Sequence, residues 1–440
     1  MNSIFRTWLD MSSTVPDRSP DGTAIPLLGG LYGHHFAGVA KGIRLYLCPL
    51  LAVAAGWTLA GQEPILRGDV DWVIGGVLDG DPAYLFDEVR ALAQDAEGRV
   101  YVLDSGSRTV RVFEHRGSHL YSIGGPGEGP GEFKIRHLCG LALDPDGRLW
   151  VNQLISFEIF EVRADGGAYF GSLVVRDGAT AALCGNPMFA GPTGITVPRR
   201  GRNIFGGKNE HVQVTMDGNV WGRVANFRTP PDFGEWEWPT VVVQDRSEGP
   251  RENFITPPFA ARVFVASAPD GGFATAFSPV YDIGVHGPDG TEKTRLRREL
   301  LGPVITDAEA REGYEELARI RDRYGDGVTS WPELVEFPDD YRIPERKPVV
   351  YRMWYDDDGR LWVCLWPEEG DTMHRAHVYD GDGVFLHEAE WPRGITIWYG
   401  GLRGDVAVGV RKVEFDVEQV VRLIFRPQPA ANPPGEGETL

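Results

Sequence analysis

The chain has 440 residues, which is long for one small hydrophobic core but suits a large domain built from repeats. Its 56 glycines and 32 prolines fit many strands joined by turns. The net charge of −19 would repel phosphate groups, so the sequence predicts no nucleic-acid partner and no binding to an anionic membrane surface.

The first sixty residues have the composition of a leader. Residues 45–60, LYLCPLLAVAAGWTLA, are apolar, follow two basic residues and end on a small one. A membrane helix needs roughly 20 apolar residues, so this segment predicts a secretory signal cleaved near Ala60 rather than a stable membrane span. Its late position indicates a translation start near Val39; a long leader and an uncleaved anchor are the alternatives. We expect a secreted or periplasmic protein that has lost residues 1–60.

A short motif recurs along the rest of the chain. DAEGRVYV (95–102), DPDGRLWV (144–151) and DDDGRLWV (356–363) each combine an acidic turn containing glycine with alternating residues that suit a strand. Weaker copies occur at 199–207 and 269–277. A second glycine turn follows each copy, and two such hairpins delimit four strands, which make one propeller blade.

A sixth unit, which begins at 395–401, contains only three strands. The segment VDWVIG (70–75) precedes the first full blade and has no partner of its own. Pairing it with the last unit completes a sixth blade and removes the free edges of an open sheet. The sequence therefore predicts an all-β, six-bladed β-propeller of four-stranded blades over 68–426, closed by an N-terminal strand, with a disordered tail at 427–440.

The glycine-rich stretch GGPGEGPGEF (124–133) is interpreted as a connector between blades. It lacks the lysine and serine of a P-loop, and Pro130 interrupts the GxGxxG spacing. Glu128 and Glu132 would repel an anion. A phosphate-binding role is therefore not predicted.

The connector also carries a resemblance to a known family. Together with FATAFSPVYDIGVHGPDG (273–290) and YRMWYDDDGRLWV (351–363), it resembles NHL-type repeats, and most of all those of bacterial secreted proteins described as six-bladed β-propellers. The resemblance implies the fold over 68–426. It implies little about activity, because propellers host many chemistries.

Propeller topology predicts where a site should lie. Turns between the first and second, and the third and fourth, strands of a blade lie on one face, and in this chain they are all tight. The long segments, including the inserts 227–258 and 300–347, fall on the other face, called here the long-loop face. Long connectors are commonly functional, so we expect binding there, at the mouth of the central channel. The expected ligand-binding residues are Asp104, Arg108, Asn152, Lys208, Asn209, Tyr281, Trp366 and His374.

Each insert carries one notable feature. Thr306 and Glu309 form a plausible capping box for a helix that continues to about Gly325. This helix is interpreted as a lid over the ring or as a decoration without function. Trp236 and Trp238 either stack on a ligand or only pin their insert to the ring.

Three functions remain open at this stage, of which the third is a purely protein–protein module of a cell-surface complex. The first is a binding scaffold that takes a small ligand or a protein partner on the long-loop face. The second, suggested by known six-bladed secreted enzymes, is a calcium-dependent hydrolase or lactonase with its site in the channel. His374 and His377 would point to opposite faces of a strand, so no metal site is predicted from them. No cofactor is predicted, and calcium enters only under the second function.

Three cysteines follow the leader, which permits at most one internal disulfide. Cys139 and Cys184 lie near the starts of neighbouring repeats and are the expected pair; three buried free thiols, including Cys364, are the alternative. We expect the protein to be a monomer.

Overall fold

The computed structural model describes residues 65–76, 80–134, 138–153, 156–174, 188–191, 194–199, 209–214, 220–227, 240–245, 249–254, 258–315 and 343–428. All of them belong to the second of two compact units, Ala60–Leu440. The predicted leader, most of the predicted tail, Trp236, Trp238 and the distal part of the insert 300–347 lie outside the described residues. In the described part, no helix has the length and apolar character that crossing a membrane would need.

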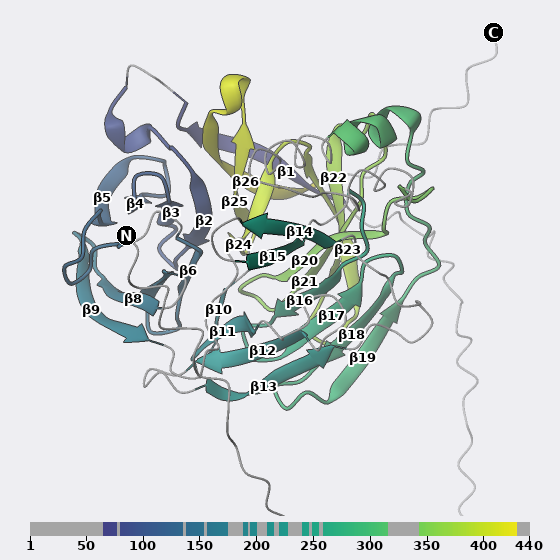
Figure 1. The fold of residues 1–440 in the computed structure, drawn as a ribbon, viewed down its shortest axis with the longest axis horizontal. Helices are drawn as coiled ribbons and strands as arrows, with labels where there is room; N and C mark the ends of the chain where they lie inside the picture. Colours follow the sequence, from purple (N-terminus) through teal and green to yellow (C-terminus); the bar gives the residue numbers. More distant parts are fainter. Residues whose placement is uncertain are drawn as a thin grey trace, which may run out of the picture. The chain divides into compact units, whose positions relative to one another are not determined.

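Four separate sheets have the four-stranded order of a propeller blade (Figure 1). The first contains β2 (Val89–Gln94), β3 (Val100–Asp104), β4 (Thr109–Phe113) and β5 (His119–Gly124), and the second β6 (Gly140–Leu143), β7 (Arg148–Asn152), β8 (Ser156–Val162) and β9 (Gly167–Val174). The third contains β10 (Phe189–Gly191), β11 (Gly194–Arg199), β12 (Asn209–Val214) and β13 (Val220–Phe227), and the fourth β16 (Val263–Ser267), β17 (Phe273–Phe277), β18 (Asp282–His286) and β19 (Glu292–Arg297). The insert 227–258 adds a hairpin of β14 (Thr240–Asp245) and β15 (Gly249–Phe254).

The fifth and sixth blades are joined into one eight-stranded sheet. Its strands, in spatial order, are β20 (Val350–Tyr355), β21 (Leu361–Leu365), β22 (Met373–Tyr379), β23 (Phe385–Pro392), β1 (Ile65–Ile74), β26 (Glu418–Gln428), β25 (Val406–Lys412) and β24 (Thr396–Arg403). Two short 3₁₀ helices, η2 (Pro82–Tyr84) and η3 (Glu414–Asp416), complete the regular elements that carry labels.

The first strands of the blades are called here the inner strands: β2, β6, β10, β16, β20 and β24. They neighbour one another in the ring: β24 lies beside β2, β2 beside β6, β6 beside β10, and β16 beside β20. The guanidinium of Arg352 on β20 donates to the carbonyl of Ile397 on β24 at 3.1 Å and so links the fifth and sixth blades. The sheets therefore follow one another around a common centre (Figure 1), which confirms the six-bladed β-propeller class.

The ring closes through β1, as the sequence predicts. β1 pairs antiparallel with β26 along its length, from Ile65 opposite Gln428 to Ile74 opposite Val420. It begins before the predicted segment 70–75 and also makes a short parallel pairing with β23. The strand thus supplies the fourth strand of the last blade.

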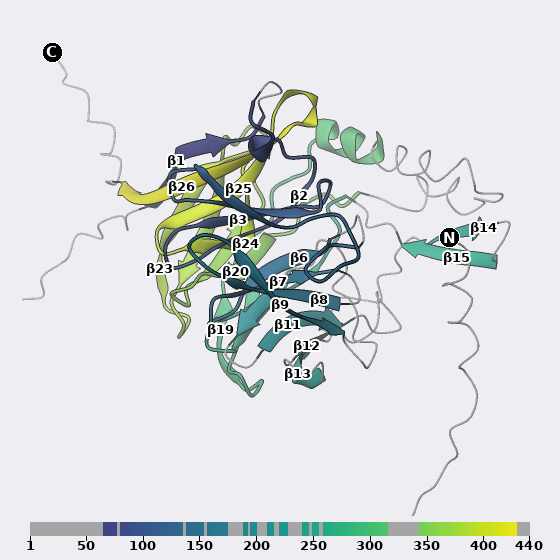
Figure 2. The same cartoon turned by 90° about the vertical axis from the view of Figure 1, so that its left-hand side faces the viewer.

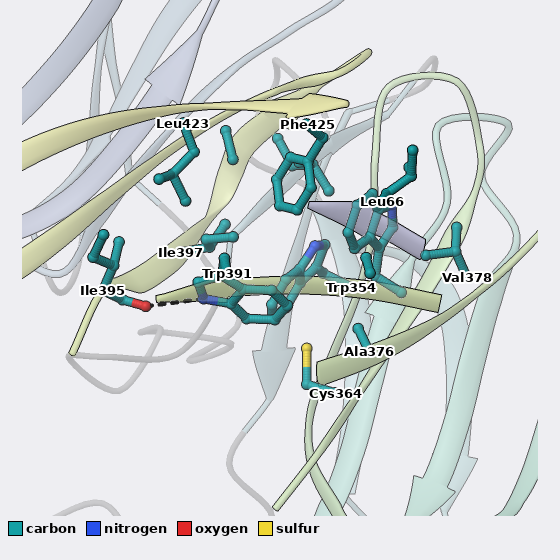
Figure 3. Packing of buried hydrophobic residues seen from close by; sticks show 14 of the residues in the cluster. Leu66, Trp354, Cys364, Ala376, Val378, Trp391, Ile395, Ile397, Leu423 and Phe425 are labelled. Carbon is teal, nitrogen blue, oxygen red and sulfur yellow. Dashed lines mark hydrogen bonds between the residues drawn. The ribbon is translucent and has the colours of Figure 1, made fainter. Parts of the chain in front are cut away.

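A large apolar cluster fills the interface between the fifth and sixth blades (Figure 3). Leu66 from β1 is buried there with Trp391 and Phe425. The indole N–H of Trp391 donates to the carbonyl of Ile395 at 3.1 Å, which satisfies the polar atom of a buried ring. Closure therefore buries apolar surface from both ends of the chain, the main favourable term in folding.

The acidic hairpin turns are structural. In the turn after β20, the carboxylate of Asp356 accepts the Arg360 backbone N–H at 2.8 Å, the Arg360 Nε–H at 2.6 Å and the Trp362 indole N–H at 2.9 Å. Asp144 makes the same three contacts in the second blade, and Asp95 binds an arginine and a tyrosine hydroxyl in the first. One aspartate therefore satisfies the turn, the arginine and a buried ring together.

The predicted capping box of the second insert is present. The Glu309 N–H donates to the Thr306 hydroxyl at 3.2 Å, and the Thr306 N–H donates to the Glu309 carboxylate at 3.3 Å. The helix begins at residue 307 and is described to residue 315 (green in Figure 2). The buried ammonium of Lys347 pairs with Glu309 and donates to the carbonyl of Pro367, so the start of the helix is anchored to the fifth blade.

Substituting Asp356→Ala should lower the free energy of unfolding by about 2–4 kcal/mol, because Arg360 and the indole of Trp362 would lose a buried partner. Asp358→Ala in the same turn is the matched control. Its side chain is 58% exposed and makes only a surface ion pair, so we expect a change within about 0.5 kcal/mol. Urea unfolding measures both, and equal losses would contradict the structural role of Asp356.

Candidate functional site

Three of the residues expected at the site lie in the first two blades, and two of them, Asp104 and Asn152, are buried. Asp104 is fully buried; its carboxylate accepts the Glu88 N–H at 2.9 Å and pairs with the Arg111 guanidinium at 3.0 Å. Asn152 ends β7 and is 1% exposed. Arg108 has a left-handed backbone, with φ of 55°, and donates to the carbonyl of Phe133 at 3.4 Å. In this structure the described contacts of Asp104 and Arg108 hold loops in place.

Tyr281 lies between the fourth and fifth blades. Its hydroxyl is 2.8 Å from the hydroxyl of Tyr379 and 2.9 Å from Nδ1 of His377, and all three side chains are buried. Burial raises the pKa of Tyr281 and lowers the pKa of His377 to about 4. The contacts join two blades.

Trp366 and His374, both expected at the site, converge on Tyr351 of β20. The Tyr351 ring centroid is 4.8 Å from the Trp366 ring and 5.9 Å from the His374 ring, with which it is stacked. His374 also contacts Trp391 at 5.3 Å. Burial lowers the pKa of His374 to about 4, with further lowering from nearby arginine charges. The strand ends that carry these residues lie on the long-loop side of the fifth blade.

Arg352 brings a positive charge to this group of rings. Its guanidinium lies 5.7 Å from the ring of Tyr351 and 5.6 Å from the ring of Tyr399 on β24. Burial raises the pKa of Tyr399, and the charges of Arg352 and Arg262 oppose that rise. Arg262 immediately precedes β16 and is exposed.

A bulge in β24 positions Tyr399 at the centre of the ring. The register with β25 shifts between Ile397 and Leu402, where WYGG replaces regular pairing. Gly401 fits only without a side chain, since a Cβ would lie 2.7 Å from a backbone oxygen, and its carbonyl accepts the Gln94 amide of the first blade. The Tyr399 ring then meets Phe189 of β10, in the third blade, edge to face at 5.9 Å. This contact links the sixth blade directly to the third.

The candidate site is the set called here the mouth cluster: Arg262, Tyr351, Arg352, Trp366, His374 and Tyr399. It offers aromatic faces and guanidinium donors, which can stack on a flat ligand and bind its polar groups. Trp366 and His374 were predicted from the sequence, and the other four residues were not. Arg262, Tyr351, Arg352 and Tyr399 could have been found from one sequence feature. Each is an arginine or a tyrosine that lies within the first strand of a repeat or directly before it.

Of the remaining expected residues, Lys208 lies outside the described residues, as does the side chain of Asn209, which begins β12. His374 and His377 contact different partners on opposite faces of β22, as predicted.

Cys139 is disulfide-bonded and Cys364 is free and buried, whereas Cys184 lies outside the described residues. The alternative of three free thiols is therefore wrong.

The described residues bring one group of acids close enough to share a cation, Asp356, Asp357 and Asp358 in a hairpin turn. Asp356 is occupied as described above, and Asp357 pairs with Arg403 at 3.2 Å and accepts the Gly404 N–H at 2.7 Å. A pocket of about 280 Å³ opens beside this turn, lined by Asp270, His286, Lys293 and Tyr355 among others. This pocket lies at the tight turns of the fourth and fifth blades, away from the mouth cluster.

Comparison with known proteins supports the fold. Residues 84–138 match the model of a family described as a 6-bladed beta-propeller. This stretch covers the first blade and its connector to the second. The chain therefore has the fold of the six-bladed β-propellers that its repeats resemble. No curated protein matches it.

Several solved structures are similar at low identity. A member of a domain family of unknown function from Bacteroides vulgatus is 11% identical, with a TM-score of 0.49 and coverage of 84% of this chain and 100% of that one. Virginiamycin B lyase from Staphylococcus aureus is 12% identical (TM-score 0.35, coverage 77% and 94%). The calcium-binding protein regucalcin from Agrobacterium tumefaciens is 12% identical (TM-score 0.34, coverage 83% and 98%). No activity or ligand is transferred from them to this chain.

Acidification from pH 7 to pH 4 should destabilise the protein. The pKa values of His374 and His377 are about 4 in the fold against 6.5 for an ordinary histidine, so the unfolded chain binds more protons in this window. Stability is then full above about pH 6.5 and is lost as pH falls towards 4, by up to about 3 kcal/mol per histidine.

Urea unfolding across this pH range measures the effect. His377→Gln should flatten the profile, whereas His115→Gln, at an exposed turn, should keep the slope of the wild type. Parallel profiles for the wild type and His377→Gln would contradict the assignment.

Proposed function

We propose that this protein is an extracytoplasmic binding propeller that holds a small ligand at the long-loop mouth of its central channel. The observation that carries the proposal is the convergence of Tyr351, Arg352 and Tyr399 from neighbouring inner strands, above the contact between Tyr399 and Phe189. The side chains of the mouth cluster are half-buried or exposed, so a ligand can reach them. Concave sites with aromatic walls and a few placed polar groups are typical of small-molecule binding.

The chemistry of the mouth favours binding over catalysis. A general base works best when its pKa is near the operating pH, and the pKa of His374 is about 4. The hydroxyl of Tyr399 stays protonated because burial raises its pKa. A calcium-dependent hydrolase would need free carboxylates, but Asp104 is paired with Arg111 and accepts backbone N–H groups. Nothing in the described residues favours that alternative.

The second insert supports a site on the long-loop side. Lys347 and Glu309 anchor its helix beside Pro367, which directly follows Trp366. Trp366 also contacts Phe259, in the connector before β16, at 5.7 Å. We propose that the insert and this connector form a wall beside the ligand, in a protein that works as a monomer.

Two features support an extracytoplasmic location. Residues 45–60 resemble a secretory signal, and Cys139 is disulfide-bonded, which is typical of oxidising compartments. On protein from the native host, the N-terminus should be near residue 61. An intact Met1 would contradict this part of the proposal.

A ligand screen tests the proposed site. A fragment library is screened against the wild type by ligand-observed NMR. Some of the compounds that bind should bind to Trp366→Ala at least about tenfold more weakly, because the variant has lost the indole surface on which they stack. The matched control is Trp72→Ala, on the outermost strand β1, which should keep wild-type binding. Ligands that respond to neither variant, or to both equally, would place binding elsewhere and contradict the proposal.

A further inference from the structure

The six inner strands that the structure describes contain no acidic residue. The chain contains 63 aspartates and glutamates and has a net charge of −19, yet none of the six inner strands contains either residue. The same strands contain Arg90, Arg352 and Arg403. In this acidic protein, the charged residues of the six described inner strands are thus all positive.

Two arginines of the mouth cluster are not neutralised by the described carboxylates. Other arginines of the blades do have a carboxylate partner, such as Arg111 with Asp104 and Arg360 with Asp356. Among the residues that the structure describes, Arg352 makes one side-chain hydrogen bond, to the carbonyl of Ile397, and neither Arg352 nor Arg262 forms an ion pair. A half-buried guanidinium without a counter-ion is costly, and within the described part of the chain most of the five N–H donors of Arg352 have no partner.

The rings around Arg352 restrict the shape of that counter-ion. The guanidinium lies 5.7 Å from the centroid of the Tyr351 ring and 5.6 Å from that of the Tyr399 ring, and Tyr399 in turn contacts Phe189. A flat apolar group fits between aromatic faces, and a planar carboxylate matches the fork of a guanidinium in two parallel hydrogen bonds. A larger anion with several charges would face the net negative charge of the whole protein.

We infer that the ligand of this site is a small planar carboxylate, with Arg352 binding the carboxylate, Arg262 adding a second positive charge and the rings of Tyr351 and Tyr399 contacting the body of the molecule. This inference rests on the proposed function, since it names the ligand class of the same site. Arg352 is the residue that distinguishes a carboxylate from a neutral ligand of the same shape.

Isothermal titration of the full chain with 2-naphthoate and with its neutral amide tests the inference. The carboxylate should bind at least about tenfold more tightly than the amide, as expected for a charge-assisted pair. Arg352→Gln should lose about tenfold for 2-naphthoate and little for the amide, and Arg352→Lys should recover only part of the loss, because the planar fork is absent. Arg116→Gln, in an exposed turn of the first blade, is the matched control and should bind as the wild type.

The outcomes separate the ligand class from the site. Equal binding of the carboxylate and the amide, with both lost in Trp366→Ala, would overturn the carboxylate inference and leave the proposed function standing. Binding of 2-naphthoate that does not change in Arg352→Gln would also overturn it. No binding of either probe, together with a fragment screen that yields no hit sensitive to Trp366, would overturn both.

A melting curve for each variant shows whether the variant is folded. If Arg352→Gln does not fold, Arg262→Gln takes its place, because Arg262 is exposed and its backbone N–H, not its side chain, makes the contact with Ser278. That variant should lose about threefold or more for the carboxylate and keep its affinity for the amide. Unchanged affinity for the carboxylate would contradict the inference.

Discussion

The pairing of β1 with β26 is the constraint on which the rest of the structure depends. It joins strands from opposite ends of the chain and places Leu66 in the apolar interface between the fifth and sixth blades (Figure 3). Gly68 belongs to the same closure, because a Cβ there would lie 3.0 Å from the ring of Phe425. With the last blade complete, β24 lies beside β2. The contact between Tyr399 and Phe189 across the centre then follows from the closed arrangement.

The repeat places negatively charged residues in the hairpin turns of the blades and positively charged residues on the inner strands. Aspartates such as Asp356 sit in the hairpins, where each binds an arginine and an aromatic side chain of its own blade. The inner strands contain no aspartate or glutamate, and the contacts of the Arg352 guanidinium within the described residues are to a carbonyl and to aromatic rings. Because the aspartates stabilise the blades from the hairpin turns, the mouth of the channel in this acidic protein carries aromatic and positively charged side chains. The proposed function rests on this contrast in charge.

Features encoded within a few residues could be predicted from the sequence, and features that depend on distant segments could not. The hairpins, the blade count and the capping box of Thr306 and Glu309 are local, and the structure contains all of them. Asp104 and Tyr281 stand beside loops in the sequence, but their side chains turn inward to Arg111 and to Tyr379. Whether a polar side chain at a strand end meets solvent or a neighbouring blade depends on packing between blades. The position of Tyr399 required both a bulge and a partner in the opposite blade, and neither follows from periodicity.

Disulfide trapping of the closure tests the central claim most directly. Arg67 on β1 and Arg426 on β26 are directly opposed in the pairing, and both side chains are exposed. Cysteines at directly opposed positions of antiparallel strands are within the span of a disulfide. The account predicts that the double variant Arg67→Cys, Arg426→Cys forms this bond on air oxidation, detected as a linked peptide by mass spectrometry, and that Arg67→Cys with Arg411→Cys on β25 does not. Free thiols at positions 67 and 426 in the folded protein would contradict the closed ring.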